Sequence, residues 1–258
     1  MADLRAEQAE TLRAPRRPYG MLARALFFGM DLIYGKKRTL SKFTVLEVIA
    51  RVPYQAWEHV AYIAMTHTYR KPGFARRVFE FVKESRMQQD NEQWHLLILE
   101  ELLQKDGTEE NFLLYRVAPQ FVAFFYYHVS WLLYVVDPKL SYALNADFED
   151  HAEHEYMEFV RDNPDFERRP FDSEFRADYG NLDTLADVLR QIGLDERHHK
   201  LESLARIDAR LGAIIRRVGP HRPIITRDPF RALVASIIQQ QVSMTAAAAI
   251  QKRVAALC

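Results

Sequence analysis

Two Glu-x-x-His pairs occur in the sequence, Glu92 with His95 and Glu196 with His199. Residues three apart lie on the same face of a helix, so each pair can offer two ligands to one metal ion. Both pairs fall within segments of helical periodicity. The residue types and their spacing therefore predict metal binding on two helices.

A further glutamate lies in each of two other helical segments, Glu47 and Glu149. Four helices that together carry four carboxylates and two imidazoles form the ligand set with which bundles hold di-iron or di-manganese sites. Four converging carboxylates would repel one another without cations, and two divalent ions balance their formal charge. Hard oxygen ligands, imidazole and open coordination positions favour two iron ions, with manganese second and zinc less suitable.

Glu47 strengthens this interpretation because of its surroundings. It lies in the run F-T-V-L-E-V-I-A, and no other charged residue occurs between Lys42 and Arg51. An unpaired carboxylate would be costly to bury in such a segment. Metal binding explains the residue, and a surface position on an otherwise apolar helix is the alternative.

Tyr156 follows Glu149 by seven residues, two helical turns along the same face. Its phenol is therefore expected near the metals, where phenols can serve as one-electron relays. The alternative is an ordinary packed tyrosine, since the chain contains 12 tyrosines.

Helical periodicity dominates the chain, and no alternating run between hairpin turns indicates a strand. We expect an all-α fold, a ferritin-like four-helix bundle with two additional interfacial or crossover helices and a short C-terminal helix pair. Thr108 and Asp137 are the expected caps of two of the helices. The expected helices cover about 19–34, 41–69 with a kink at Pro53, 73–106, 108–136, 138–163, 183–218 and a pair from 228 onward.

Residues 117–136 contain no formal charge over a length that could span a bilayer. A transmembrane helix here would place Glu92 and Glu149 on opposite sides of the membrane, where they could not share a site. We therefore favour a crossover helix with one face in the lipid interface over a spanning helix, and plain bundle core is the alternative. Residues 19–34, mostly apolar and aromatic, indicate a second interfacial helix.

The formal charge is zero overall but unevenly distributed. Residues 206–258 contain nine Lys and Arg against two Asp and Glu, leaving 26 basic and 33 acidic residues before them. We expect an N-terminal arm (1–18), a bundle domain (19–205) and a basic helical tail (206–258). A hydrophobic content of 48% excludes intrinsic disorder. The one cysteine, Cys258, excludes a disulfide framework, so a reducing compartment is expected, and residues 1–18 predict no signal peptide.

Four motifs around these residues resemble those of the alternative oxidase family, the non-haem di-iron quinol oxidases that include the plastid terminal oxidase. The family's L-E-T-x-x-x-V-P appears here as L-E-V-I-A-R-V-P, and its N-E-R-M-H-L as N-E-Q-W-H-L. Its L-E-E-E-A-I-H-S-Y-T-E-F appears as F-E-D-H-A-E-H-E-Y-M-E-F, and its A-D-E-x-x-H as L-D-E-R-H-H. The motifs occur in the family's order over roughly residues 19–204, which makes the resemblance specific.

The resemblance implies an enzyme that oxidises a quinol of the ubiquinol type and reduces dioxygen to water. It also implies monotopic membrane attachment through residues 19–34 and 111–136, with a homodimer as a candidate assembly. The implied metal ligands are Glu47, Glu92, His95, Glu149, Glu196 and His199. The implied functional residues beyond them are Tyr156 as the redox-active catalytic tyrosine, Asn91 and Asp195 as hydrogen-bond partners that orient the histidines, and Lys42, Leu46 and Ala152 in the quinol pocket.

The chain departs from the family pattern near the implied pocket. Lys42 replaces an arginine, offering one point charge in place of a planar fork. His151 replaces the last of three glutamates, Glu155 replaces a small residue, and Gly193 replaces an arginine. A di-iron hydroxylase acting on a lipid-like substrate therefore stays an alternative function.

The basic tail resembles a different family. From Asp228, D-P-F-R-A-L-V-A-S-I-I-Q-Q-Q-V-S is similar to the opening helices of helix-hairpin-helix DNA glycosylases of the alkyladenine class. The resemblance implies a truncated fusion without the catalytic aspartate, so DNA contact is conceivable and base excision is not expected. Two alternatives stay open, an alanine-rich helix pair packed on the bundle and a nucleic-acid-binding or scaffold protein that acts through the tail.

Overall fold

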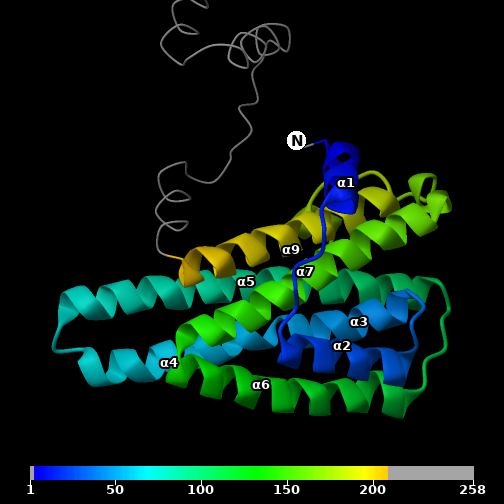
Figure 1. The fold of residues 1–258 in the computed structure, drawn as a ribbon. Helices are drawn as coiled ribbons and strands as arrows, with labels where there is room; N and C mark the ends of the chain where they lie inside the picture. The colour runs from blue at the N-terminus through cyan, green and yellow to red at the C-terminus, as the bar shows by residue number, and fades with distance from the viewer. Residues whose placement is uncertain (1–2, 209–258) are drawn as a thin grey trace, which may run out of the picture. The chain divides into compact units, whose positions relative to one another are not determined.

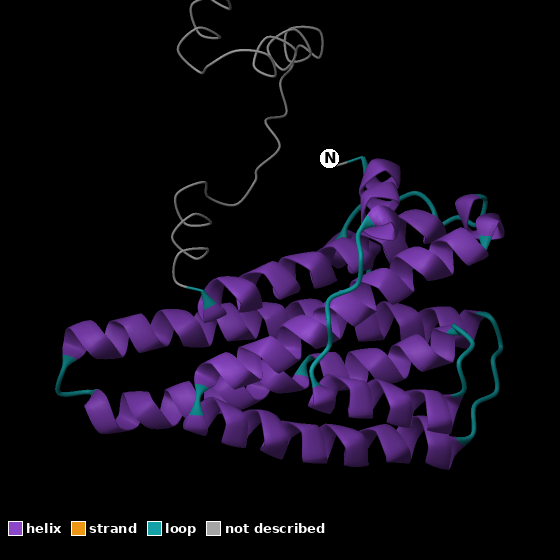
Figure 2. Cartoon of the chain, in the orientation of Figure 1, coloured by secondary structure: helices purple, strands orange, loops and turns teal. Residues whose placement is uncertain are grey.

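The computed structural model describes residues 3–208, so the glycosylase-like segment and the helix pair expected from 228 lie outside the described residues. Helices account for most of the described chain, and its one β-type pairing is the isolated bridge between Pro170 and Thr184 (Figures 1 and 2). The all-α prediction is confirmed. The helices are α1 (Leu4–Arg13), α2 (Met21–Tyr34), α3 (Leu40–Ala50), α4 (Val52–Thr68), α5 (Pro72–Lys105), η1 (Leu113–Val117), α6 (Ala118–Val136), α7 (Pro138–Asp162), η2 (Pro164–Glu167), α8 (Arg176–Tyr179) and α9 (Leu185–Ile207).

The helices α3, α5, α7 and α9 surround the centre of the bundle. The most extensive packing joins α7 to α9, and the long helix α5 packs against both α3 and α4 (Figure 1). The main hydrophobic core includes Ile49 of α3, Leu99 of α5, Phe148 of α7 and Leu189 of α9, none of which has more than a trace of exposed surface. Each of the four helices therefore turns one face inward, as a bundle requires.

The helix ends follow local rules that the sequence shows only in part. The prediction of one long helix with a kink at Pro53 is wrong. The segment forms two helices that are separated at Arg51, and Pro53 takes the favoured place of a proline in the first turn of α4. The prediction that Thr108 caps the helix before Val136 is wrong. The side chain of Asn111 accepts the capping hydrogen bond there, from the Leu114 amide at 3.0 Å. Asp137 caps α7 as predicted, accepting from the Lys139 amide.

The N-terminal segment forms a helix that the periodicity did not predict. Helix α1 packs on α7 and α9, and its buried Thr11 donates to Glu153 of α7 at 2.6 Å. Arg197 and Lys200 of α9 approach the same carboxylate, at 2.9 and 2.5 Å. Charged and polar contacts therefore fasten α1 across the pair of helices that carries half of the candidate ligands.

Helices α2 and α6 expose large apolar side chains. No helix within residues 3–208 has both the length and the apolar character to cross a membrane. Helix α6 lies along the bundle beside α2, and an apolar groove of about 290 Å³ lies between them. The exposed residues include Met21, Phe28 and Leu32 on α2, and Phe121, Phe124, Phe125, Leu132 and Val135 on α6.

Glu153 should contribute stability that depends on pH. Its burial would raise its pKa, but the ammonium of Lys200 and the hydrogen bonds from Lys200, Thr11 and Arg197 lower the pKa overall. A group whose pKa is lowered by folding stabilises the protein above its unfolded pKa, and this stability is lost as the pH falls through the folded pKa. We expect Glu153→Gln to lower the free energy of unfolding by about 2 kcal/mol at neutral pH and by less below pH ~4.

Urea unfolding at several pH values measures this difference. Glu80→Gln is the control, because the pair that Glu80 forms with Lys83 is exposed and should contribute little. An equal effect of the Glu153 substitution at neutral and acidic pH would contradict the assignment.

Candidate metal centre

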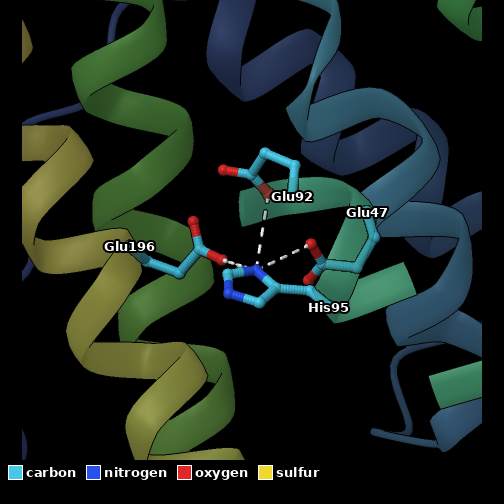
Figure 3. A group of neighbouring side chains, drawn as sticks. All are labelled: Glu47, Glu92, His95 and Glu196. Carbon is cyan, nitrogen blue, oxygen red and sulfur yellow. Dashed lines mark ion pairs between the residues drawn. The ribbon is translucent and has the colours of Figure 1, made fainter. Parts of the chain in front are cut away.

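Six candidate ligands from four helices converge in the interior of the bundle. They fall into two groups, and within each group one ligand atom of every residue lies within 4.8 Å of the others. Figure 3 shows that the first group surrounds the ring of His95, with contributions from α3, α5 and α9. The first group is Glu47, Glu92, His95 and Glu196, and the second is Glu92, Glu149, Glu196 and His199.

Glu92 and Glu196 belong to both groups. Each group completes its set with one further glutamate and one histidine, so the two groups are alike in chemistry. Five of the six side chains have no exposed surface, and His199 retains 6%. The arrangement offers two adjacent cation positions joined by two shared carboxylates.

The hydrogen bonding of the six residues tests whether metal ions fit here. Of 13 buried side-chain nitrogen and oxygen atoms without a hydrogen-bond partner in residues 3–208, eight belong to these six residues. Neither carboxylate oxygen of Glu92 or Glu196 receives a hydrogen bond, whereas Glu47 and Glu149 lack a hydrogen bond only at Oε2. Unpaired buried polar atoms are costly. Metal ions would bind these atoms, so the residues present fit such ions.

The electrostatics lead to the same conclusion. Burial raises the pKa of Glu47 well above its ordinary value, and the charge of Glu196 raises it further. Burial and the charges of Glu196 and Glu92 do the same to the pKa of Glu149. The interior thus holds more negative charge than its two histidines balance, which is the condition that attracts divalent cations.

Asp195 fixes the orientation of His95. The Nε2 atom of His95 lies 3.2 Å from Asp195 Oδ2, which also accepts hydrogen bonds from Tyr179 at 2.7 Å and Asn91 at 3.3 Å. A proton on Nε2 leaves the lone pair of Nδ1 free, and Nδ1 lies 3.2 Å from Glu196 Oε1. Asn91 therefore reaches the histidine only through Asp195. The other histidine, His199, places its Nδ1 2.7 Å from Glu92 Oε1.

Two buried phenols hold the remaining carboxylate oxygens, in a crossed arrangement. Tyr156, seven residues after Glu149, donates its hydroxyl hydrogen bond to Glu47 Oε1. Tyr54, seven residues after Glu47, donates to Glu149 Oε1 at 2.5 Å. The sequence analysis missed Tyr54, although the seven-residue spacing that singled out Tyr156 applies to it equally. It also missed Tyr179, for which no local signal exists.

The three residues predicted for a substrate pocket lie in different surroundings. Leu46 and Ala152 are core residues with 3% and 0% of their surface exposed. Lys42 pairs through Nζ with Asp31 at 2.6 Å and with the Gly35 carbonyl at 2.8 Å. A cavity of about 520 Å³ opens next to this pair, with Tyr19, Phe27, Phe28, Asp31 and His151 among its lining residues.

The comparison with protein families decides the assignment. The protein-family model described as alternative oxidase matches residues 18–208 of the chain. The chain belongs to the alternative oxidase family. The motif resemblance is thereby confirmed. The alternative oxidases are a di-iron family, and the two ligand groups suit two metal ions, so the predicted iron cofactor agrees with both the family and the site.

Curated relatives of the alternative oxidase family share the motif region. The chain is 35% identical over 132 residues to ubiquinol oxidase 4, chloroplastic/chromoplastic, of Arabidopsis thaliana, covering 51% of this chain and 34% of that protein. It is 26% identical over 172 residues to a mitochondrial ubiquinol oxidase of Mangifera indica, covering 65% and 50%. A mitochondrial ubiquinol oxidase 2 of Glycine max is 26% identical over 175 residues, covering 66% and 48%. The alignments thus span between a third and a half of these alternative oxidase relatives.

Metal analysis tests the centre directly. We expect about two irons per chain, because the two ligand groups offer two positions. Glu92→Ala and Glu196→Ala should each lose both irons, since each residue contributes to both groups. Loss of iron should also lower the thermal midpoint, because binding of metal stabilises the folded state.

The exposed Glu80 supplies the matched control, and Glu80→Ala should keep the full iron content. A wild-type protein that is equally stable with and without iron would contradict the role assigned to the four buried carboxylates.

Proposed function

We propose that the protein is a quinol oxidase that transfers electrons from two quinols to one dioxygen, giving water. The observation that carries this proposal is the pair of ligand groups that share Glu92 and Glu196 in a chain of the alternative oxidase family. In this proposal Glu47 and His95 would hold one iron, Glu149 and His199 would hold the other, and Glu92 and Glu196 would contribute ligands to both. When bound, the two irons supply the one-electron steps that dioxygen reduction requires.

The residues of the chain position the ligands and shield the centre from bulk water. The four carboxylates are completely buried, so bulk solvent does not reach them. Asp195 holds the His95 ring in place. Tyr156 fixes one oxygen of Glu47, which leaves the other oxygen free for a metal. The phenol of Tyr156 thus lies one hydrogen bond from a proposed ligand, which supports the role of electron relay for this residue.

The quinol is proposed to enter the cavity beside Lys42 and Asp31. The cavity has the volume of a small-molecule site. Its wall contains Phe27 stacked on His151 with ring centroids 3.9 Å apart, a surface suited to a flat quinol ring. Lys42, one turn before Leu46 and Glu47 on α3, would supply the positive charge near the quinol oxygens. Leu46 and Ala152 would close the buried end of the path.

Membrane attachment is proposed to occur through α2 and α6. These two helices expose the apolar side chains described above, and quinols are dissolved in the lipid that such a face would contact. Attachment through residues 19–34 and 111–136 would be monotopic and would place the quinol cavity, which α2 helps to line, at the lipid surface. The homodimer, the reducing compartment and DNA contact by the tail stay predictions.

Oxygen consumption with a short-chain ubiquinol tests the activity. Iron-loaded protein should consume one dioxygen for every two quinols oxidised. Lys42→Ala should raise KM about tenfold, because a charge-assisted hydrogen bond is lost and Asp31 is left unpaired. Lys37→Ala, which removes an exposed charge from the segment between α2 and α3, should leave KM unchanged. Oxygen uptake by the reduced iron protein without quinol turnover would favour the hydroxylase alternative.

Sedimentation with vesicles of phosphatidylcholine and phosphatidylglycerol tests attachment. The double substitution Leu32→Glu and Phe125→Glu should weaken binding at least ~10-fold, because two large apolar side chains no longer enter the lipid. Met87→Glu is the control, since Met87 is 70% exposed but lies on α5. Equal binding of the double variant and the wild type to the vesicles would rule out the face of α2 and α6 as the membrane contact.

A further inference from the structure

A satellite cluster of aromatic residues lies apart from the main core, next to the metal centre. Its buried members are Tyr54 and Trp57 of α4 and Tyr142 of α7, and Tyr134 of α6 packs against them. We call these four residues the aromatic file. Every ring in the file is a tyrosine or a tryptophan, the two residue types whose side chains lose single electrons most readily among aromatic residues.

The rings of the aromatic file touch in sequence. The ring centroids of Tyr54 and Trp57 are 5.2 Å apart, and those of Trp57 and Tyr142 are 4.6 Å apart. Tyr142 and Tyr134 follow at 5.5 Å, with their hydroxyl oxygens 3.1 Å apart, and Tyr134 also stacks on Trp57 at 6.0 Å. Because Tyr54 also donates to Glu149, van der Waals contacts and hydrogen bonds connect a proposed metal ligand to Tyr134 without interruption.

The polar groups of the aromatic file all have partners. Tyr54 bonds to Glu149, Trp57 Nε1 donates to Ser141 Oγ at 2.8 Å, and the hydroxyls of Tyr142 and Tyr134 pair with each other. A phenol that loses an electron becomes a strong acid, so its proton needs an acceptor, whereas an indole radical cation can keep its proton. Glu149 can take the proton of Tyr54, and the Tyr134 hydroxyl can relay the proton of Tyr142 to solvent.

The surroundings of Tyr156, on the other side of the centre, are different. Tyr156 stacks on Phe43 at 4.3 Å, Phe43 contacts Phe159 at 4.9 Å, and Phe159 contacts Phe166 at 5.2 Å. Phenylalanine has no oxidisable hydroxyl or indole group. Both phenols at the centre are thus buried among aromatic rings, but only Tyr54 contacts rings that can pass an electron onward. Hydrophobic packing by itself does not require this difference.

The aromatic file reaches the surface of the protein. Tyr134 is partly exposed, and Trp57 and Tyr142, which are 5% and 7% exposed, line a small pocket of about 20 Å³ together with Glu84, Gln88 and Arg206. The pocket is too small to admit a reductant, so a soluble reductant would donate its electron from the protein surface beside these rings, without entering the quinol cavity.

We propose that the aromatic file conducts single electrons from a soluble one-electron reductant of the ascorbate class to the centre when quinol is absent. This proposal rests on the proposed function, because dioxygen at the centre supplies the oxidant. Tyr54 gives one electron to the oxidised centre and its phenolic proton to Glu149, and Trp57 then reduces the Tyr54 radical, which regains the proton. Tyr142 then reduces the Trp57 radical cation and passes its phenolic proton to the Tyr134 hydroxyl, which releases its own proton to solvent. The reductant finally gives one electron and one proton to the Tyr142–Tyr134 pair, so the net change is one hydrogen atom taken from the reductant, one electron delivered to the centre and one proton released.

The test uses the full chain loaded with iron, reduced, and mixed with dioxygen in the absence of quinol. Electron paramagnetic resonance with ring-deuterated tyrosine detects the radicals, and mass spectrometry maps oxidised residues. We expect oxidation at Trp57, Tyr142 and Tyr134 that ascorbate suppresses. Trp57→Phe should lower oxidation of Tyr142 and Tyr134 several-fold and lengthen the lifetime of the Tyr54 radical. Trp131→Phe, a matched change on α6 outside the file, should alter neither signal.

The double substitution Tyr142→Phe and Tyr134→Phe gives an independent second test should Trp57→Phe fail to fold, because both rings that contact Trp57 on its outer side are changed and oxidation should end at Trp57. Unchanged oxidation of Tyr134 in folded Trp57→Phe, or no oxidation of Trp57 in the folded double variant, overturns the proposal. Oxygen uptake by the reduced iron protein with no oxidation of the aromatic file overturns the relay and leaves the oxidase intact. Absence of oxygen uptake overturns the proposed oxidase and the relay with it.

Discussion

Four carboxylates share the buried interior of this bundle, and the rest of the structure depends on how their charge is balanced. None of the four has exposed surface, and only two of their eight oxygens receive hydrogen bonds, both from phenols. Protein groups alone therefore leave the centre unsatisfied. Two divalent cations would both balance the charge and bind the free oxygens. Formation of the core and binding of the metals are in this sense a single event.

The helices around the centre are held close by small residues and by charge. Gly193 brings α9 against α7, since a Cβ at this position would lie 3.3 Å from the Cβ of Tyr156 and 3.0 Å from the Met157 side chain. Outside the carboxylates, Arg197 and Lys200 form ion pairs with Glu153. These two ion pairs join α9 to α7 on the side that α1 covers, and they reduce the freedom of the helices that carry the ligands.

The sequence predicted features that depend on local geometry. The three-residue spacing of Glu92 and His95, the isolation of Glu47 in an apolar run, and the cap at Asp137 all act within a few residues, so they are visible without a structure. Contacts between distant segments were not predictable. Tyr54 bonds to a residue 95 positions away, and Tyr179 reaches the histidine through Asp195, which only the folded loop brings near.

The crossed phenols reveal an internal repeat. In each half of the bundle a glutamate is followed seven residues later by a tyrosine, and then by a helix with Glu-x-x-His, first as Glu47 with Tyr54 and then as Glu149 with Tyr156. Each tyrosine bonds to the glutamate of the opposite half. A single helical hairpin of this type would lack the acceptor for its phenol and half of the carboxylates. The arrangement is what duplication of one hairpin, followed by association of the two copies, would produce, and it makes neither copy sufficient without the other.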